Sequence, residues 1–306
     1  MSAQDDDSPP VELVPTDSLL PHEETLKDIT EEISRRIRQD GFVIHPIVAE
    51  RESLVILDGM HRAAALRLLK TPLSPVHLVD YMSSNVILNC WYRIAYEPIP
   101  EDTILELAER LGLRTERQNL DTAIKAVEER RNLLCFLTRT SRSAVALKTP
   151  GSLDILTIYR YVSEVDKVLR SYSVVYMRES EALDKIRRGE AASCWIVPRV
   201  RKHEVINLAK HGHLLPPKTT RHIIYGRPMF TFTPLEILNM SDVEAARERN
   251  RRLLQGMKYV VLPPNKVIDR LYEEDVRVYI QEDEQLLKKY YPEGVLRIIR
   301  EGAASP

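Results

Sequence analysis

The chain has 306 residues, of which 43% are hydrophobic and 29% are charged, and its formal net charge at pH 7 is −1. This length suits about two domains, and the apolar fraction is enough for a sizeable buried core. The balanced charge argues against a protein that depends on nucleic acid, because such proteins usually carry a basic excess. No apolar run approaches the roughly 18 residues of a membrane span, so we expect no membrane segment.

The three cysteines are far apart, and no two of them form a Cys-x-x-Cys pair. We therefore expect neither a disulfide framework nor a zinc site, and the pattern fits a reducing cytoplasm. Residues 1–10 are acidic and polar, unlike a signal peptide, and we expect a disordered tail there. The abundance of Arg, Glu and Ile beside few Gln indicates a thermophilic source, through surface ion pairs and fewer thermolabile amides.

The first part of the chain shows the alternation of a compact α/β unit. Its predicted elements are a strand and turn over 11–20, a helix over 23–41, β-rich segments over 42–50, 54–57, 76–82 and 86–92, and a helix over 61–70. Gly41 and the Thr71-Pro72 pair are the expected stops of the two helices. A connecting helix over 101–113 completes a predicted domain at 11–115.

A second unit is predicted at 116–240, again with strands and helices in alternation. Its expected elements are a helix over 120–131, a hairpin of strands at 133–138 and 143–148, helices over 152–170, 179–190 and 201–212, and strands over 173–177 and 193–198. We therefore expect an α/β (α+β) protein of two domains. The remainder, 241–306, is charged and partly helical, and the sequence assigns it no role.

The ten glycines are never closer than eight residues apart. A P-loop needs two glycines five positions apart followed by Lys, and a dinucleotide fingerprint needs three within six positions. Both common nucleotide cradles are therefore excluded, and any phosphate must be held in another way.

The junction LVILDGMHRAAALRLLK leads from an apolar strand into a helix through Asp58, Gly59, Met60, His61 and Arg62. A helix N-terminus attracts anions, Gly59 lets a phosphate approach the backbone, and His61 and Arg62 add donors. Asp58 ends the strand and could hold Mg²⁺, which prefers carboxylate and phosphate oxygens. In the alternative interpretation Asp58 is an ordinary helix cap and His61 and Arg62 are solvated. The residues alone leave the two interpretations level.

This junction, with LLPHEE upstream and the helix between them, resembles the ParB/sulfiredoxin superfamily, in which such a turn binds nucleotide phosphates. Met60 stands where sulfiredoxins carry their catalytic cysteine, so thiol chemistry is not expected. The chromosome-partitioning branch has a helix-turn-helix domain after this unit, whereas this chain shows α/β alternation. The resemblance implies a ParB/sulfiredoxin-like nucleotide-binding domain at 11–115.

The segment HGHLLPPKTTRH, residues 211–222, resembles the closing motif of the free serine kinases. These enzymes transfer phosphate from ADP or ATP to L-serine and form O-phosphoserine. Their Pro-His-Glu, Asp-Gly-x-His-Arg and Trp-Tyr motifs also occur here in order, and the resemblance covers roughly residues 11–225. It departs at Met60, where a second His is frequent, and in the tail after 240, which the shortest members lack. It implies a cytoplasmic kinase that uses Mg²⁺ and ATP or ADP, with a product that feeds cysteine and serine metabolism.

The same resemblance implies the site residues. Glu23 would take the proton of the serine hydroxyl, although a carboxylate there could also be a simple helix cap. The donor phosphates would lie on the junction, with Asp58 and His61 in catalytic roles and Asp58 as the Mg²⁺ ligand. The residues implied for substrate binding are Trp91, Lys218, Thr219, Thr220, Arg221 and His222. Trp91 could equally belong to the core. We expect the site in a cleft between the domains, where closure excludes water.

Two other features invite functional interpretations that we reject. We reject a metal site at His211 and His213, because the sequence shows no third ligand. We reject a nucleic-acid-binding patch at the basic run 247–254, because this run follows acidic residues on the same predicted helix. The alternative functions are a ParB-like nucleotide-binding protein associated with DNA, and a nuclease of that class. Threonine and homoserine stay open as acceptors, because one methylene changes binding by only about 1–3 kcal/mol. The oligomeric state is left open.

Overall fold

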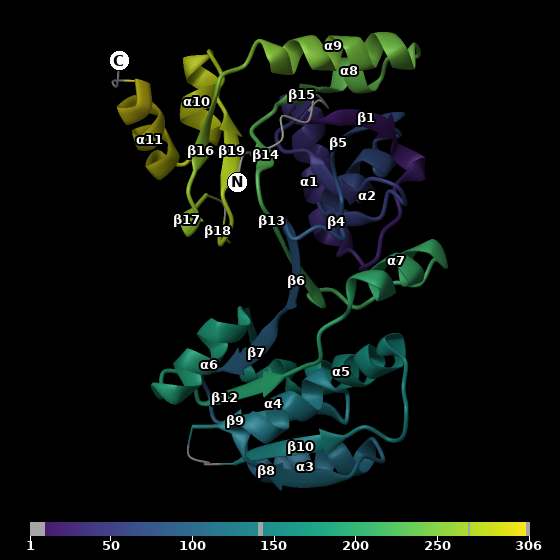
Figure 1. Ribbon diagram of the computed structural model, residues 1–306, viewed down its shortest axis with the longest axis vertical. Helices are drawn as coiled ribbons and strands as arrows, with labels where there is room; N and C mark the ends of the chain where they lie inside the picture. Colours follow the sequence, from purple (N-terminus) through teal and green to yellow (C-terminus); the bar gives the residue numbers. More distant parts are fainter. Residues whose placement is uncertain (1–9, 140–142, 269, 304–306) are drawn as a thin grey trace. The chain divides into compact units, whose positions relative to one another are not determined.

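The structure, a computed structural model, describes residues 10–139, 143–268 and 270–303, with side chains described as far as residue 300. The chain divides into two compact units (Figure 1). The first unit contains the described residues of Met1–Ile87, Leu208–His213 and His222–Pro306, and the second contains those of Leu88–Asn207 and Leu214–Arg221. The predicted disordered tail lies outside the described residues, apart from Pro10. No helix in the described ranges is long and apolar enough to cross a membrane.

The first unit begins with a four-stranded mixed sheet in the order β1-β5-β3-β4. β3 pairs with β5 in parallel, and the other two pairings are antiparallel. The elements of this segment are β1 (Glu12–Pro15), a 3-10 helix (Thr16–Ser18), α1 (Lys27–Asp40), β2 (Phe42–Val43), β3 (Ile47–Glu50), β4 (Ile56–Asp58), α2 (Met60–Leu68) and β5 (Leu73–Val79). The predicted strands and both predicted helices are confirmed here, with boundaries that differ by a few residues.

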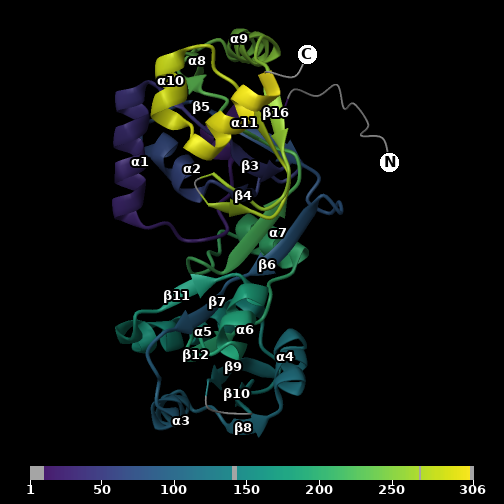
Figure 2. The same ribbon diagram turned by 90° about the vertical axis from the view of Figure 1, so that its left-hand side faces the viewer.

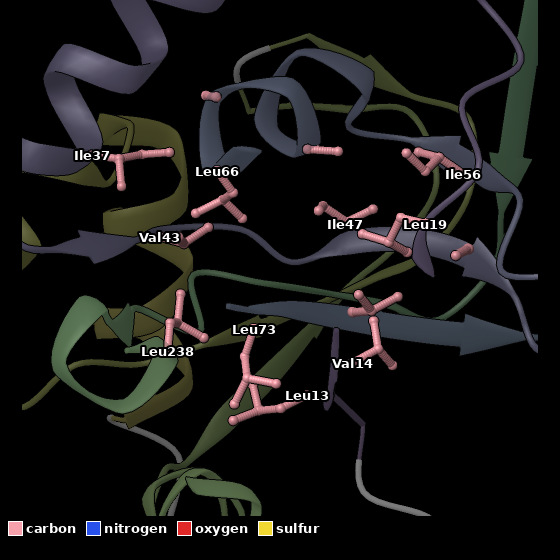
Figure 3. Packing of buried hydrophobic residues seen from close by; sticks show 14 of the residues in the cluster. Leu13, Val14, Leu19, Ile37, Val43, Ile47, Ile56, Leu66, Leu73 and Leu238 are labelled. Atoms are coloured by element: carbon pink, nitrogen blue, oxygen red, sulfur yellow. The ribbon is translucent and has the colours of Figure 1, made fainter. Parts of the chain in front are cut away.

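The core of this unit lies between the sheet and its helices (Figure 3). Ile47 and Ile56 from the sheet and Leu66 from α2 are fully buried, so α2 is fixed by an apolar face that the sequence marks. α1 ends as predicted at Gly41, which has φ of +81° and donates its N–H to the carbonyl of Ile37. The helix predicted over 23–41 begins later than expected, because Leu26 precedes α1 and is exposed.

The chain returns to the first unit after residue 221 and completes it. The added elements are β13 (Thr220–Ile224), β14 (Arg227–Met229), β15 (Thr233–Pro234), α8 (Leu235–Leu238), α9 (Val243–Gln255), β16 (Tyr259–Leu262), β17 (Lys266–Val267), β18 (Leu271–Tyr272), β19 (Val276–Tyr279), α10 (Glu284–Tyr290) and α11 (Glu293–Ala303). A three-stranded sheet, β14-β19-β16, has its own apolar cluster with side chains from both terminal helices.

The segment after residue 240 is part of this unit and not a separate appendage. Ala246 of α9 lies in the same core cluster as the first sheet. The side-chain amide of Asn250 donates to the Val11 carbonyl over 3.1 Å, and Arg247 donates to the Leu13 carbonyl over 3.2 Å. α9 therefore packs on β1, at the opposite end of the sequence.

The second unit is built on a six-stranded sheet in the order β11-β7-β12-β9-β10-β8, in which every pairing is antiparallel (Figure 2). Its elements and their links are β6 (Val86–Cys90), β7 (Tyr92–Ala95), α3 (Glu101–Arg110), β8 (Thr115–Gln118), α4 (Leu120–Glu128), β9 (Asn132–Thr138), β10 (Ala144–Lys148), α5 (Ile155–Leu169), a 3-10 helix (Arg170–Tyr172), β11 (Val175–Met177), α6 (Glu179–Arg187), β12 (Ser193–Ile196) and α7 (Lys202–Lys210).

The predicted β9–β10 hairpin and the predicted helices of this unit are confirmed. β8 was not predicted, because its sequence TERQ is polar and its four residues form an edge strand with exposed side chains. Three of the four boundaries between the two units fall within β6, α7 and β13, and the fourth lies between His213 and Leu214.

Candidate active site

The junction between β4 and α2 has the strand–turn–helix form that the sequence predicts. Gly59 lies in the left-handed region, with φ of +95°, and is the residue before the first turn of α2. No side chain caps this helix, so Asp58 is not the helix cap of the simpler interpretation. A Cβ atom on Gly59 would lie 2.8 Å from Nη2 of Arg62. The glycine therefore makes room for the guanidinium of Arg62, which folds back over the turn.

The carboxylate of Asp58 is held by arginines. Its Oδ2 accepts hydrogen bonds from Arg227 over 2.6 Å and from Arg270 over 3.3 Å, and Nη2 of Arg62 lies 3.8 Å away. Burial acts to raise the pKa of Asp58, but Arg270, Arg227 and Arg62 together hold that pKa well below its usual value. Asp58 is consequently a carboxylate at any physiological pH.

These arginines and Asp58 line a small cavity of the first unit, which we call the arginine pocket. Its volume is about 70 Å³, room for several waters. The lining residues are His45, Pro46, Val48, Asp58, Arg62, Arg227, Pro228, Met229, Arg270 and Tyr272. Three arginines and one aspartate give this lining a formal charge of +2, which suits an anion.

A magnesium ion at Asp58 does not fit this arrangement. Three guanidiniums already surround the carboxylate, and a divalent cation beside them would meet strong repulsion. No group of three or more His, Cys, Asp or Glu side chains that could hold a metal occurs among the residues that the structure describes. The surroundings of Asp58 favour an anion and not the metal that the resemblance implied.

His61 joins α2 to the start of α1. Its Nε2 accepts a hydrogen bond from the backbone N–H of Leu26 over 3.1 Å, at the start of α1. The ring is therefore neutral in this arrangement, with its proton on Nδ1. His61 is held in place and is not the solvated side chain of the simpler interpretation.

The predicted base, Glu23, lies beside a row of buried rings. Nδ1 of His22 donates to the carbonyl of Ile56 over 2.6 Å, and burial lowers the pKa of His22 to about 4. His22 is therefore neutral at pH 7, so its 3.9 Å separation from the Glu23 carboxylate is not an ion pair. Glu23 keeps 13% of its side chain exposed and can be reached by a ligand.

His222 belongs to the same row, although it is the last residue of the second motif. Its ring meets that of His22 edge-on, with centroids 5.5 Å apart, and its Nε2 lies 2.8 Å from the hydroxyl of Tyr81. Burial raises the pKa of Tyr81, so its hydroxyl stays protonated, and the tautomer of His222 decides which of the two groups donates. Two motifs from distant parts of the sequence thus meet in the first unit.

Three of the other four residues of that motif contact Trp91 in the second unit. Nε1 of Trp91 donates to the Thr220 carbonyl over 3.1 Å. Nζ of Lys218 lies 5.4 Å from the indole centroid and Cζ of Arg221 lies 5.6 Å from it. Thr219 is buried and donates its hydroxyl to the Pro216 carbonyl over 2.7 Å. Lys218, Thr220 and Arg221 therefore lie together around the Trp91 ring.

The backbone conformation of Lys218 is unusual for a residue with a side chain. Its φ is +63°, in the left-handed region that costs energy outside glycine. Such strain persists only where the surroundings hold it, and here Thr219 and Thr220 on one side are buried. The strained position directs the Lys218 ammonium over Trp91.

A buried glutamate that the sequence analysis missed supports this cluster. Oε1 of Glu179 accepts from Nε of Arg199 over 2.6 Å and from the Cys90 thiol over 3.3 Å, while its Oε2 lies 3.8 Å from Arg221. Burial and Glu179 raise the pKa of Cys90, which therefore stays a thiol. Glu179 fixes Arg221 as a counter-ion, and it has no motif that could have marked it.

Three residues of the first unit were also missed: Tyr81, Arg227 and Arg270. Each is a single polar residue in a segment without motif spacing, and only the fold brings it to Asp58 or His222. The one available signal was the sequence GRPM, in which an arginine directly follows a turn glycine. That signal is too common to indicate a site.

No family model matches the chain. The chain is 30% identical over 232 residues to an ATP-dependent L-serine kinase of Staphylothermus marinus, and the alignment covers 74% of this chain and 90% of that protein. It is 26% identical over 223 residues to an ADP-dependent L-serine kinase of Thermococcus kodakarensis, with 69% and 86% covered. Among solved structures, a variant of a free serine kinase in complex with ADP is similar in fold, with a TM-score of 0.62, 22% identity, and 74% and 93% of the two chains covered.

Proposed function

The chain belongs to the free L-serine kinase family, and from this premise we propose that it transfers the terminal phosphoryl group of ATP or ADP to the hydroxyl of free L-serine. It is then a phosphotransferase with an alcohol group as acceptor, and its product is O-phospho-L-serine. The observation that carries this proposal is the 30% identity to an ATP-dependent L-serine kinase across 74% of the chain. The geometry of the arginine pocket and of the residues around Trp91 supports it.

The donor phosphates bind at the junction of β4 and α2 in this proposal. The first turn of α2 offers backbone N–H groups, and the arginine pocket beside it has a lining charge of +2. Phosphoryl transfer depends mainly on positioning and on neutralising the phosphate charge, which is what such a pocket supplies. No step is assigned to a metal at Asp58.

The acceptor is positioned by the remaining residues. Glu23 takes the hydroxyl proton as the new oxygen–phosphorus bond forms, and the nucleotide leaves with one phosphate fewer. The Lys218 and Arg221 cations bind the carboxylate of serine beside Trp91, because paired cations on a rigid ring suit a small carboxylate. That these residues and Glu23 serve one reaction is part of the proposal.

The finer features of the biology are proposed with the reaction. Entry of the product into cysteine and serine metabolism and a cytoplasmic location follow from the proposed activity. A thermophilic source is supported by surface ion pairs in which one glutamate serves two arginines, such as Glu32 with Arg35 and Arg36 on α1.

The test is product formation from serine. Purified protein is incubated with L-serine and either ATP or ADP in the presence of Mg²⁺, and O-phosphoserine is measured by mass spectrometry. Threonine and homoserine serve as parallel acceptors. Product with at least one donor is expected, and its absence with both donors from folded protein would overturn the proposal. A ParB-like DNA-associated protein or nuclease would instead give no product and would bind or cleave DNA.

A further inference from the structure

The charged residues of the arginine pocket come from three separate parts of the first unit. Asp58 and Arg62 come from the predicted nucleotide motif, Arg227 comes from β14, and Arg270 and Tyr272 come from the region of β18. The last two lie in the segment after residue 240, to which the sequence assigned no role. The pocket therefore gives that segment a place in the site.

Arg227 is a buried cation with unused hydrogen-bonding capacity. Only 4% of its side chain is exposed, and it lies between Asp58 and Glu274, with Nε 3.3 Å from the latter. Its Nη2 has no hydrogen-bond partner within the described part of the chain. A buried guanidinium with an unsatisfied donor is costly, and a ligand oxygen in the pocket would relieve that cost.

Arg270 is held at the edge of the same pocket. Its guanidinium stacks on Tyr272 at 5.0 Å and contacts Asp58 at 3.3 Å, and 44% of its side chain is exposed. Tyr272 also supports Arg227, whose Cζ lies 5.4 Å from the ring. One tyrosine and one aspartate thus hold both guanidiniums in fixed positions.

The chemistry of this arrangement suits phosphate oxygens. A guanidinium carries five N–H donors, and Nη2 of the buried Arg227 has no acceptor within the described part of the chain. A planar guanidinium held in place binds phosphate with little loss of side-chain freedom. Asp58 is itself an acceptor, so it orients the arginines and does not contact the phosphate.

We propose that Arg227 and Arg270 bind the phosphate chain of the donor nucleotide, and that Asp58 is a positioning residue for these arginines and not a metal ligand. This inference rests on the proposed kinase function, because it names residues of the donor site. It assigns the segment around β18 a direct part in nucleotide binding.

The test is nucleotide affinity without metal. Dissociation constants for ATP and ADP are measured by isothermal titration calorimetry in excess EDTA for the wild type, Arg270→Ala and Arg277→Ala. Arg277 is the matched control, since it stacks on Tyr259 at 6.0 Å and does not line the pocket. We expect Arg270→Ala to raise Kd about tenfold or more for at least one nucleotide. Arg277→Ala should bind both nucleotides like the wild type, and both variants should keep the wild-type melting temperature. An unchanged Kd in Arg270→Ala would overturn the proposal.

Asp58→Asn separates the positioning role from a metal role. If Asp58 positions the arginines, Asp58→Asn changes the nucleotide Kd by the same factor in EDTA and in Mg²⁺. If it holds a metal, the change appears only with Mg²⁺, and the proposal fails. Arg227→Lys, which keeps the buried charge, is the second variant of the pocket and is expected to weaken binding because Lys lacks the planar fork; wild-type affinity in Arg227→Lys would remove Arg227 from the proposal.

The outcomes also distinguish this inference from the kinase proposal. A protein that binds ATP or ADP through Arg270 but forms no O-phosphoserine supports the pocket and overturns the function. A protein that forms O-phosphoserine while Arg270→Ala binds both nucleotides like the wild type supports the function and overturns the pocket.

Discussion

Glu23 lies at the surface end of a row of buried polar rings. His22 beside it is neutral, because burial lowers its pKa to about 4 and its Nδ1 proton is committed to the Ile56 carbonyl. Behind it, Nε2 of His222 lies 2.8 Å from the Tyr81 hydroxyl. The Glu23 side chain keeps 13% of its surface exposed while that of His22 keeps 1%, so we expect a substrate hydroxyl to meet the Glu23 carboxylate.

Replacing Glu23 by Gln is expected to lower kcat by about 10²- to 10⁴-fold, since the amide cannot accept the serine proton. Nucleotide affinity should stay within a factor of two or so, because no contact to the arginine pocket is lost. The measurement is a steady-state O-phosphoserine assay beside a calorimetric titration with nucleotide. Glu24→Gln is the control, since Glu24 is exposed. Full turnover in Glu23→Gln would show that another group takes the proton.

The buried His22 and the half-buried His77 predict loss of stability in mild acid. Burial lowers the pKa of His22 and of His77 from the ordinary 6.5 to about 4. Between these values the unfolded chain binds more protons than the folded one, so stability falls as pH drops from about 6.5 toward 4. From pH 7 to pH 5 each histidine lowers the free energy of unfolding by roughly 2 kcal/mol.

Urea unfolding at pH 7 and pH 5 measures this effect. The free energy of unfolding of the wild type should be lower at pH 5 than at pH 7. The decrease should be about half as large in His77→Gln. Equal stability of the wild type at both pH values would mean that His22 and His77 are not buried in neutral form.

The junction of β4 and α2 shows how one element builds a site. The strand is buried, the glycine turns the chain, and the helix begins without a side-chain cap. The uncapped first turn leaves N–H groups for another acceptor, and Arg62 from the same turn reaches back over Gly59 toward Asp58. The element thus brings donors and a cation to one place.

Gly59→Ala should damage both stability and binding. The left-handed φ of +95° costs an alanine about 1–2 kcal/mol, and its Cβ would lie 2.8 Å from the Arg62 guanidinium and displace it. Gly41→Ala is the matched control, because Gly41 has φ of +81° and a Cβ added there would meet nothing within 4 Å. Both variants should lose similar stability in urea unfolding, but only Gly59→Ala should bind nucleotide more weakly. Equal nucleotide affinity in the two variants would contradict the role of Arg62.

On the scale of the whole molecule, the described residues from His222 onward complete the first unit, of which they form the third segment. α9 shows why this was hard to predict. Its buried positions, Ala246, Asn250 and Leu254, follow helical spacing but are separated by arginines and glutamates. The sequence therefore indicated a solvated helix, whereas Asn250 in the middle of the stripe bonds the backbone of Val11.

The local elements and the motifs could be predicted from the sequence, because each depends on neighbouring residues. α2 follows from its Ala and Leu face, and the end of α1 from Gly41. The pairing of strands and the assembly of the arginine pocket could not be predicted, because they join residues such as Asp58 and Arg270 that no sequence period links. The same holds for the division of the Lys218–His222 motif, whose last residue lies with His22.

The most direct test of the kinase account follows phosphorus itself. A ³¹P NMR time course is recorded on one sample that contains the wild-type protein, L-serine and ATP or ADP with Mg²⁺, and on a second with Glu23→Gln. The account predicts that the amount of O-phosphoserine formed in the first sample equals the amount of nucleotide converted. In the second sample the nucleotide signals should stay constant and no O-phosphoserine should appear. Loss of nucleotide to inorganic phosphate without O-phosphoserine, or no conversion at all by the wild type, would contradict it.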